Sequence, residues 1–314
     1  MPELPDVTAY VVALESRVRG RAILGVRVTS PFVVRTFDPP ISSLKGDQIV
    51  RVSRLGKRIV FDLQSGLYLV IHLMIAGRFK WSDELKAKVP GKLGLAAFDF
   101  DNGTLLLTEA SPKKRASIHL ARSLDEFQRG GIEPLESTFA QFEEALRREN
   151  HTLKRSLTDP RLFSGIGNAY SDEILHRGKL SPAQLSQRLT AEDARTLYDA
   201  TQTVLREWTD RFVAEARGKF PEKVTAFRPE MAVHGKYKEP CPVCGTAVQR
   251  IAYADDTETN YCPRCQTGGR LLSDRSLARL LHDDWPKTIE ELEEKMPQRA
   301  SKAPGARTTR KDKP

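Results

Sequence analysis

The sequence has no run of about 18 or more apolar residues, so no segment is expected to span a membrane as a helix. A signal peptide is not expected either, because Glu3, Asp6 and Glu15 interrupt the N-terminal segment and no long apolar stretch follows a basic start. The sequence also contains no internal repeat. The predicted location is therefore cytoplasmic.

Cysteine is scarce, and the four cysteines form two pairs, Cys241-x2-Cys244 and Cys262-x2-Cys265. Two disulfides are an alternative, but a cytosolic location and CxxC spacing favour a metal. The 17 residues between Cys244 and Cys262 fit a four-cysteine zinc site, so we expect these thiolates to bind Zn²⁺. The segment between the pairs is typical of a β-hairpin. The zinc either only holds a small subdomain together or also places this hairpin against nucleic acid.

Acidic residues are outnumbered, with 41 Asp and Glu against 50 Lys and Arg, a net charge of +9 and a pI near 9.4. This balance favours a polyanionic partner, DNA or RNA, over a basic protein without one. The hydrophobic fraction of 39% is typical of a globular protein, and 314 residues are enough for two domains with separate cores. We expect a monomer.

The first part of the chain, residues 1–125, is predicted to be mainly β-structure. A helix over about 5–19 is expected first. The expected strands are 49–54, 58–64, 67–73, 96–100 and 104–109. Gly66 and the Asp101-Asn102-Gly103 turn separate the later pairs, as hairpin turns do.

The rest of the chain follows a linker at 126–137, which contains Gly130-Gly131 and Pro134. Residues 138–232 are predicted to be helical and to end in a mobile loop, with the longest helix over 190–216. The cysteine region covers 233–270. In the extension 271–314, Ser273-Asp274 opens a short helix, Thr288 and Glu291 form a capping box, and the basic end is expected to be disordered.

The N-terminus has a pattern that fits amine catalysis. Removal of Met1 leaves Pro2 with a secondary amine, which can attack a carbonyl-like carbon and form a cationic Schiff base. Glu3 follows directly and is a candidate for proton transfer. The alternative is an ordinary start in which Pro2 and Pro5 are stiff loop residues.

A second pattern, Gly165-Ile166-Gly167-Asn168, lies between two predicted helices. Two glycines permit a tight turn whose backbone N–H groups point at a phosphate, and Asn168 offers a further donor. The alternative is a plain helix–helix turn. Lys57 lies in a basic turn between strands, where by itself it is only a surface charge.

Together and in order, these motifs resemble the formamidopyrimidine-DNA glycosylase/endonuclease VIII (Fpg/Nei) family over about residues 1–266. The resemblance rests on Pro2-Glu3-Leu4-Pro5, Gly56-Lys57, His72-Leu73-x3-Gly77, Gly165-Ile166-Gly167-Asn168-Ala169-Tyr170-x2-Glu173, and Val233-x-Gly235-Lys236 before the four-cysteine finger. It implies an α+β fold with an N-terminal β-sandwich domain, a helix-two-turn-helix domain over 138–232 and a C-terminal zinc finger.

The resemblance also implies a function, namely excision of oxidised bases from damaged double-stranded DNA after base flipping. Pro2 would attack the sugar C1′, Glu3 would assist ring opening, and β,δ-elimination would cut the strand. Lys57 would belong to the catalytic set and would also match a family residue that binds a phosphate around the lesion. Lys154 and Asn168 would bind phosphates near the lesion.

Three departures from the family pattern are present: the tip of the finger, the residues of two loops that fill the gap left by the flipped base, and the length of the chain after the finger. Thr257 stands where the family finger carries an arginine that grips phosphates, between Asp255-Asp256 and Glu258; Arg250 and Arg264 are the nearby cations. In the family, a methionine fills the gap left by the flipped base. Its position corresponds to Ile75 in this chain, and Met74 is adjacent. The loop that contacts the opposite strand reads Ser111-Pro112-Lys113-Lys114-Arg115-Ala116, without the family Phe, and leaves Arg115 as its candidate contact. The chain also continues well past the finger.

Two further hypotheses remain beside a glycosylase with AP-lyase activity. Thr257 motivates a damaged-DNA-binding protein on the same fold with weak or lost base excision. A zinc-ribbon RNA-binding protein with an unrelated N-terminus is the third.

Overall fold

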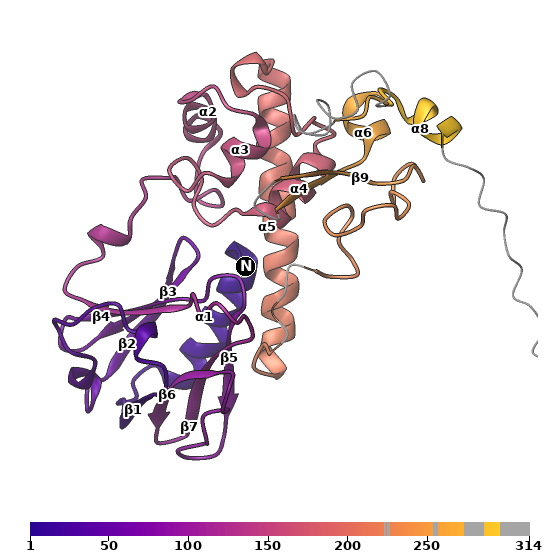
Figure 1. The fold of residues 1–314 in the computed structure, drawn as a ribbon. Helices are drawn as coiled ribbons and strands as arrows, with labels where there is room; N and C mark the ends of the chain where they lie inside the picture. The colour runs from indigo at the N-terminus through magenta and orange to yellow at the C-terminus, as the bar shows by residue number, and fades with distance from the viewer. Residues whose placement is uncertain (223, 225–226, 254–256, 273–285, 296–314) are drawn as a thin grey trace, which may run out of the picture.

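The computed structural model describes residues 1–222, 224, 227–253, 257–272 and 286–295. Its N-terminal part contains two four-stranded sheets and helix α1 (Leu4–Val18), and its C-terminal part contains helices and a two-stranded hairpin (Figure 1). The predicted α+β fold is confirmed, including the four cysteines clustered near the C-terminal end. The domain boundaries given above remain predictions.

The two sheets of the N-terminal part are antiparallel and pack around an aromatic and aliphatic core. The first has the strand order β1-β6-β7-β5 and the second the order β2-β3-β4-β8. Phe61, Phe79 and Phe98 from the two sheets are at most 1% exposed. The strands are β1 (Gly25–Val28), β2 (Ile49–Leu55), β3 (Arg58–Leu63), β4 (Tyr68–His72), β5 (Gly77–Ser82), β6 (Gly94–Phe100), β7 (Gly103–Glu109) and β8 (Ser117–Ala121).

All five predicted strands are present, and the turn at Asp101-Asn102 joins β6 to β7 as expected. The prediction missed β1, β5 and β8. Strand β1 has only four half-buried residues, and β5 carries Arg78 and Lys80 between its apolar residues. These strands form because long-range partners complete their ladders, which outweighs a weak local pattern.

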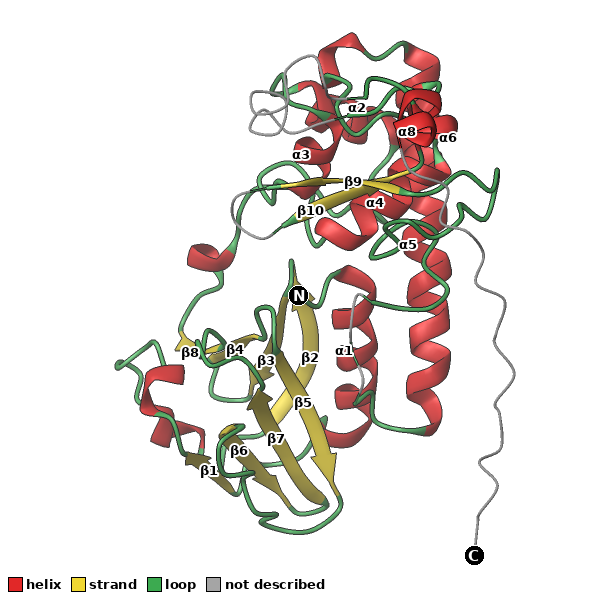
Figure 2. Ribbon diagram, turned by 45° about the vertical axis from the view of Figure 1, so that its right-hand side comes forward, coloured by secondary structure: helices red, strands yellow, loops and turns green. Residues whose placement is uncertain are grey.

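The helical part packs against α1 through its longest helix, so one continuous core joins the two parts. Figure 2 shows α1 and α5 side by side. Thr138, Thr152 and Thr190 accept hydrogen bonds from backbone N–H groups at three helix starts, which stabilises these ends. The helices are α2 (Phe139–Arg147), α3 (Leu153–Thr158), α4 (Asn168–Arg177) and α5 (Ala191–Gly218), and short 3-10 turns lie at η1 (Pro31–Val33), η2 (Ile41–Leu44), η3 (Asp125–Phe127) and η4 (Ser186–Arg188).

The cysteine region contains the predicted hairpin, β9 (Gln249–Ala252) and β10 (Glu258–Tyr261), followed by α6 (Pro263–Thr267). Part of the extension is attached to it, because Leu271 N donates to Lys287 O (2.8 Å) and Ile289 N donates to Gly269 O (3.0 Å). Thr288 accepts from Glu291 N at the start of α8 (Ile289–Lys295), which confirms the threonine half of the predicted capping box. The Glu291 carboxylate accepts from Lys287 N (2.7 Å). The helix expected after Ser273-Asp274 and the basic end lie outside the described residues. No helix in the described ranges has the length and apolarity needed to cross a membrane.

Candidate active site and zinc centre

The candidate active site lies where the start of α1 meets the start of α4. Glu3 directly precedes α1, and its carboxylate contacts the backbone at the start of α4. Glu3 is 3% exposed and accepts backbone hydrogen bonds from Gly167 (2.7 Å), Ala169 (2.9 Å) and Tyr170 (3.2 Å). The positive end of the α4 dipole favours a negative group there. The backbone N–H groups that the sequence predicted for a phosphate therefore bind Glu3 instead, because the two segments, 164 residues apart, meet in the fold.

The turn before α4 leaves room for two side chains. Leu4 N donates to Gly165 O (2.9 Å), and Gly165 has a left-handed backbone with φ +82°. A Cβ at Gly167 would lie 2.5 Å from the Glu3 carboxylate and 2.5 Å from Lys57 Nζ. Gly167 is thus required for space, since it lets the carboxylate and the ammonium group approach the same backbone.

Lys57 and the N-terminal amine occupy a desolvated environment. Burial lowers the pKa of Lys57, and Lys154 lowers it further, while Glu3 acts in the opposite direction. Burial also lowers the pKa of the N-terminal ammonium of Met1. Pro2 is buried, and Met1 lines a cavity of about 620 Å³ together with Lys57, His72 and Gly165. Removal of Met1 would expose the Pro2 nitrogen toward this cavity.

Two further titratable groups belong to this region. The sequence analysis assigned a role to neither of them, although His72 stands in the His72-Leu73-x3-Gly77 motif. Asp6 Oδ2 accepts from Glu3 N (2.9 Å), and burial raises the pKa of Asp6 to about 7. Burial lowers the pKa of His72 to about 4, and Arg58 and Lys57 lower it further. Near neutral pH the histidine is uncharged and the Asp6 carboxyl is partly protonated. Asp6 lies three residues after Glu3 and completes the α1 capping box, which is the sequence signal for its position.

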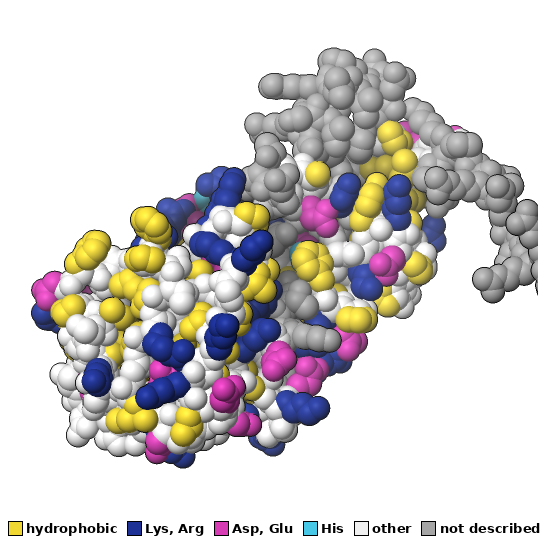
Figure 3. Space-filling view, turned by 60° about the horizontal axis from the view of Figure 1, so that its bottom comes forward, with side chains coloured by type: hydrophobic (Ala, Val, Ile, Leu, Met, Phe, Trp, Pro, Cys, Tyr) yellow, Lys and Arg dark blue, Asp and Glu magenta, His cyan; other side chains and the backbone are white. Residues whose placement is uncertain are grey.

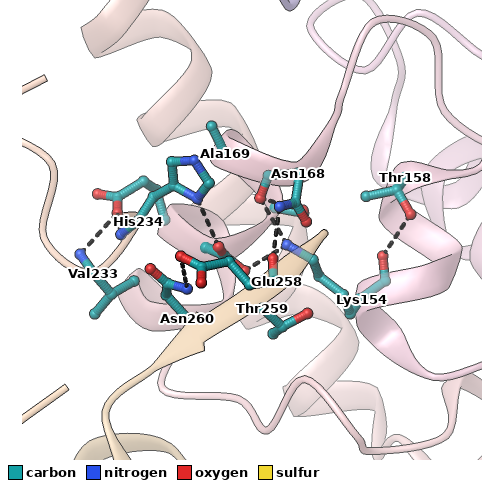
Figure 4. Close-up of polar contacts among 12 residues, drawn as sticks. Lys154, Thr158, Asn168, Ala169, Val233, His234, Glu258, Thr259 and Asn260 are labelled. Atoms are coloured by element: carbon teal, nitrogen blue, oxygen red, sulfur yellow. Dashed lines mark hydrogen bonds and ion pairs between the residues drawn. The ribbon is translucent and has the colours of Figure 1, made fainter. Parts of the chain in front are cut away.

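Lys154 and Asn168, predicted to bind phosphates, lie together at the start of α4 (Figure 4). Lys154 Nζ donates to Asn168 O (2.7 Å) and Asp172 Oδ1 (2.5 Å), and its side chain is 10% exposed. Asn168 Nδ2 donates to Glu258 O (2.6 Å) on β10. The lysine is therefore oriented by a buried carboxylate, and the asparagine connects α4 to the finger hairpin.

Helix α4 also holds the segment that enters the finger. Asp172 Oδ2 lies 2.8 Å from His234 Nδ1, so this carboxylate bridges Lys154 and the histidine. Glu173 accepts backbone hydrogen bonds from Ala232 (2.8 Å), Val233 and His234 (2.9 Å each). Glu173 belongs to a motif that the sequence resemblance uses, but the motif does not indicate that its carboxylate binds the backbone of residues 232–234, about 60 residues further along the chain.

The loop between β4 and β5 presents Ile75. Met74 has a left-handed backbone with φ 54°, and Gly77 N donates to Leu73 O (2.9 Å), which closes a tight turn. Ile75 at the tip is 58% exposed, whereas Met74 is half-buried. The structure thus makes Ile75 the more accessible of the two predicted apolar contacts.

Arg115 lies on a loop organised by a buried carboxylate. Glu109, 1% exposed, accepts from Arg115 N (2.8 Å) and Ala116 N (3.1 Å), and Lys114 donates to Glu109 O. The Arg115 side chain remains exposed. Because Gly77 pairs with Glu109, the loops carrying Ile75 and Arg115 leave neighbouring strands at the same end.

The four cysteines form a compact thiol cluster that fits zinc. Their sulfur atoms all lie within 4.8 Å of one another, with Cys241 to Cys265 at 3.9 Å and Cys244 to Cys262 at 3.4 Å. Tetrahedral zinc with bonds of about 2.3 Å to each sulfur requires sulfur separations close to these. The cysteines are free thiols rather than disulfides. The four thiolates would hold Zn²⁺ in a structural site that leaves no coordination position open.

The finger hairpin has little free positive charge on its described residues. Arg250 Nη1 lies 3.1 Å from Glu258 Oε2, and its guanidinium lies over the Tyr237 ring at 4.4 Å. The arginine is therefore already paired with the acid next to Thr257. Figure 3 shows Lys and Arg side chains spread over one face of the molecule with apolar side chains between them, rather than in a single stripe.

Comparison with known proteins places this chain in the class of helix-two-turn-helix proteins that also carry a glycosylase-type N-terminal domain and a zinc finger. Residues 1–116 match the formamidopyrimidine-DNA glycosylase N-terminal domain, 131–211 its H2TH domain, and 238–268 a zinc finger found in FPG and IleRS. Formamidopyrimidine-DNA glycosylases of Solibacter usitatus and Bacillus cereus are 32% and 33% identical, each aligned over 85% of this chain and 99% of the relative. The chain belongs to the formamidopyrimidine-DNA glycosylase (Fpg/Nei) family.

Solved structures agree with this assignment. Lactococcus lactis Fpg bound non-covalently to DNA containing an AP site has a TM-score of 0.73 and 27% identity, over 84% of this chain and 99% of that one. A variant of the same enzyme with DNA containing Fapy-dG has a TM-score of 0.74 and 27% identity, over 85% and 100%. The family matches end at residue 268, so the attached extension lies beyond them.

Proposed function

We propose that this chain is a bifunctional DNA glycosylase and AP lyase that removes oxidised bases from double-stranded DNA. The observation that carries the proposal is the arrangement at the start of α1. Glu3 is fixed by three backbone N–H groups, Lys57 lies beside it at Gly167, and the amine end opens on a cavity of about 620 Å³. The DNA-complex structures of relatives support a damaged-DNA partner.

The proposed chemistry uses the Pro2 amine as the nucleophile. Its lone pair forms a bond to C1′ while the bond from C1′ to the damaged base breaks, and the base leaves with the electron pair. Opening of the sugar ring transfers a proton to O4′ and gives an iminium ion between Pro2 and C1′. Glu3 is placed to assist that proton transfer, and Lys57 provides positive charge nearby. Successive β- and δ-elimination then break the C3′–O and C5′–O bonds.

Lys154 and Asn168 are assigned to DNA by their position and polar groups, and Ile75 and Arg115 by their exposure. Lys154 and Asn168 lie together at the start of α4 and are proposed to face a phosphate near the lesion. Ile75, with Met74 behind it, is proposed to fill the gap left by the flipped base, and Arg115 to contact the opposite strand. An Ile75→Ala substitution should reduce cleavage of lesion duplex more than Met74→Ala does. The reverse order would reject this assignment.

The alternative is a damaged-DNA-binding protein with weak or lost excision. It is favoured by Thr257 and by the pairing of Arg250 with Glu258, since neither leaves a free cation at that point of the hairpin. The two functions differ in turnover. Duplexes with one oxidised base or one abasic site should be cut to products with phosphates at both ends if β,δ-elimination occurs. Tight binding without base release or cleavage would support the alternative instead.

A further inference from the structure

The finger is joined to the helical part by a histidine that approaches one of its sulfur atoms. His176 lies in the last turn of α4, is 6% exposed, and has its Nε2 atom 3.3 Å from Cys241 Sγ. Hydrogen bonds to sulfur have donor–acceptor distances of this size. The contact joins two segments 65 residues apart, so it belongs to the tertiary structure.

The chemistry of the zinc site fixes the direction of this hydrogen bond. Zinc binds cysteine as the thiolate, which has no proton to donate. A ring nitrogen 3.3 Å from a zinc-bound Cys241 sulfur must therefore carry the hydrogen. Four thiolates around Zn²⁺ carry a net charge of −2, and N–H donors offset that charge in a buried site.

One of the other sulfur atoms receives a hydrogen bond from inside the finger. Cys265 N donates to Cys262 Sγ (3.5 Å). The hydrogen bond between Cys241 Sγ and His176 Nε2 links a zinc ligand to a side chain of the helical part. The side chain of Gln266 also links the finger to the helical part. Its Nε2 donates to Leu180 O (2.9 Å), and its Oε1 accepts from Cys262 N (2.8 Å).

We propose that His176 is a positioning residue of the zinc centre, which donates a hydrogen bond from Nε2 to the Cys241 thiolate and thereby docks the finger on α4. The other end of α4 carries the backbone N–H groups that hold Glu3. Ala169 and His176 are seven positions apart, which is a rise of about 10 Å along one rigid helix. The zinc centre and the catalytic carboxylate thus use the two ends of the same helix.

The test uses the full-length protein with His176→Phe and His176→Gln, and His151→Phe as the matched control. His151 is a half-buried histidine of the same helical part, and its Nε2 lies 2.6 Å from Glu149 instead of a sulfur. Two properties are measured: the rate of zinc transfer to a chromogenic chelator, and the sulfur-to-metal charge-transfer band of the cobalt-substituted protein. Circular dichroism establishes that each variant is folded.

His176→Phe should release zinc about 10- to 100-fold faster, the size of effect typical of groups that orient metal ligands. Its charge-transfer band should shift, because the sulfur loses a donor. His176→Gln, which keeps an N–H donor, should restore part of both properties, and His151→Phe should match the parent protein. Equal effects of Phe and Gln, or an unshifted band in folded His176→Phe, would overturn the proposal.

A measurement without substitution covers the case in which His176→Phe does not fold. In the cadmium-113-substituted protein, a scalar coupling between the metal and the Hε2 proton of His176 should be detectable through the N–H···S bond. An Hε2 proton observed without that coupling would also overturn the proposal. Neither readout depends on glycosylase activity, so the proposed function can fail independently.

Discussion

Gly167→Ala tests the packing that places Glu3 and Lys57. The new Cβ would lie 2.5 Å from the Glu3 carboxylate carbon and from Lys57 Nζ, where ordinary contacts are 3.4–4 Å. One or both groups must therefore move by about 1 Å, and a misplacement of that size costs on the order of 10²-fold in rate. Overpacking of a closed site also costs about 1–3 kcal/mol of unfolding free energy. The Glu3 hydrogen bonds to the α4 backbone are the contacts expected to weaken.

The assay is single-turnover cleavage of an abasic duplex, accompanied by thermal unfolding. Gly178→Ala is the matched control, because it lies at the other end of α4 with φ −77° and its Cβ would be 3.5 Å from the nearest atom. The control should cleave at the parent rate with an unchanged or slightly higher melting temperature. A Gly167→Ala protein with parent-level cleavage and stability would refute the role assigned to this close approach.

Three other predictions follow from the buried groups and from the finger. Burial raises the pKa of Asp6 to about 7, above its unfolded value of about 3.9. The folded protein therefore binds this proton more tightly than the unfolded chain. The resulting contribution to the unfolding free energy is complete below about pH 4 and is lost as the pH rises toward 7. The unfolding free energy of the parent should thus fall over this range relative to Asp6→Asn, and parallel pH profiles would contradict it. Cys262→Ser should release zinc, measured by atomic emission, and abolish DNA binding; unchanged zinc content would reject the ligand assignment. Truncation after Gly269 removes the buried Ile289 and the Leu272 N–H that donates to the Tyr261 hydroxyl (2.7 Å), so the melting temperature should drop by several degrees, whereas an unchanged value would show that the extension adds no stability.

Local signals in the sequence predicted the local structure well. The turn at Asp101-Asn102 fixed the β6–β7 pairing, and the two CxxC motifs indicated both the zinc ligands and the hairpin between them. The strands that were missed are short or carry charged residues, and they depend on partners that are far away in sequence.

The arrangement of the site depended on contacts that one sequence does not reveal. Glu3 was predicted as a proton carrier, but nothing in its neighbourhood indicated that it would bind the N–H groups of the Gly167 turn. The pairing of Lys154 with Asp172 was not predicted for the same reason. Asp172 lies within a helical segment, and nothing near it in the sequence indicates a lysine partner on another helix. His176 had no recognisable motif, because its role comes from packing against Cys241.

The most direct test of the account is reduction of the covalent intermediate. The protein, with Met1 removed, is incubated with an abasic-site duplex and borohydride, beside Pro2→Gly and Glu3→Gln variants. Peptide mass mapping then locates the crosslink. The account predicts a trapped complex on the Pro2 nitrogen that is lost in Pro2→Gly. A crosslink on a lysine instead, or no trapped complex while DNA binding is intact, would contradict it.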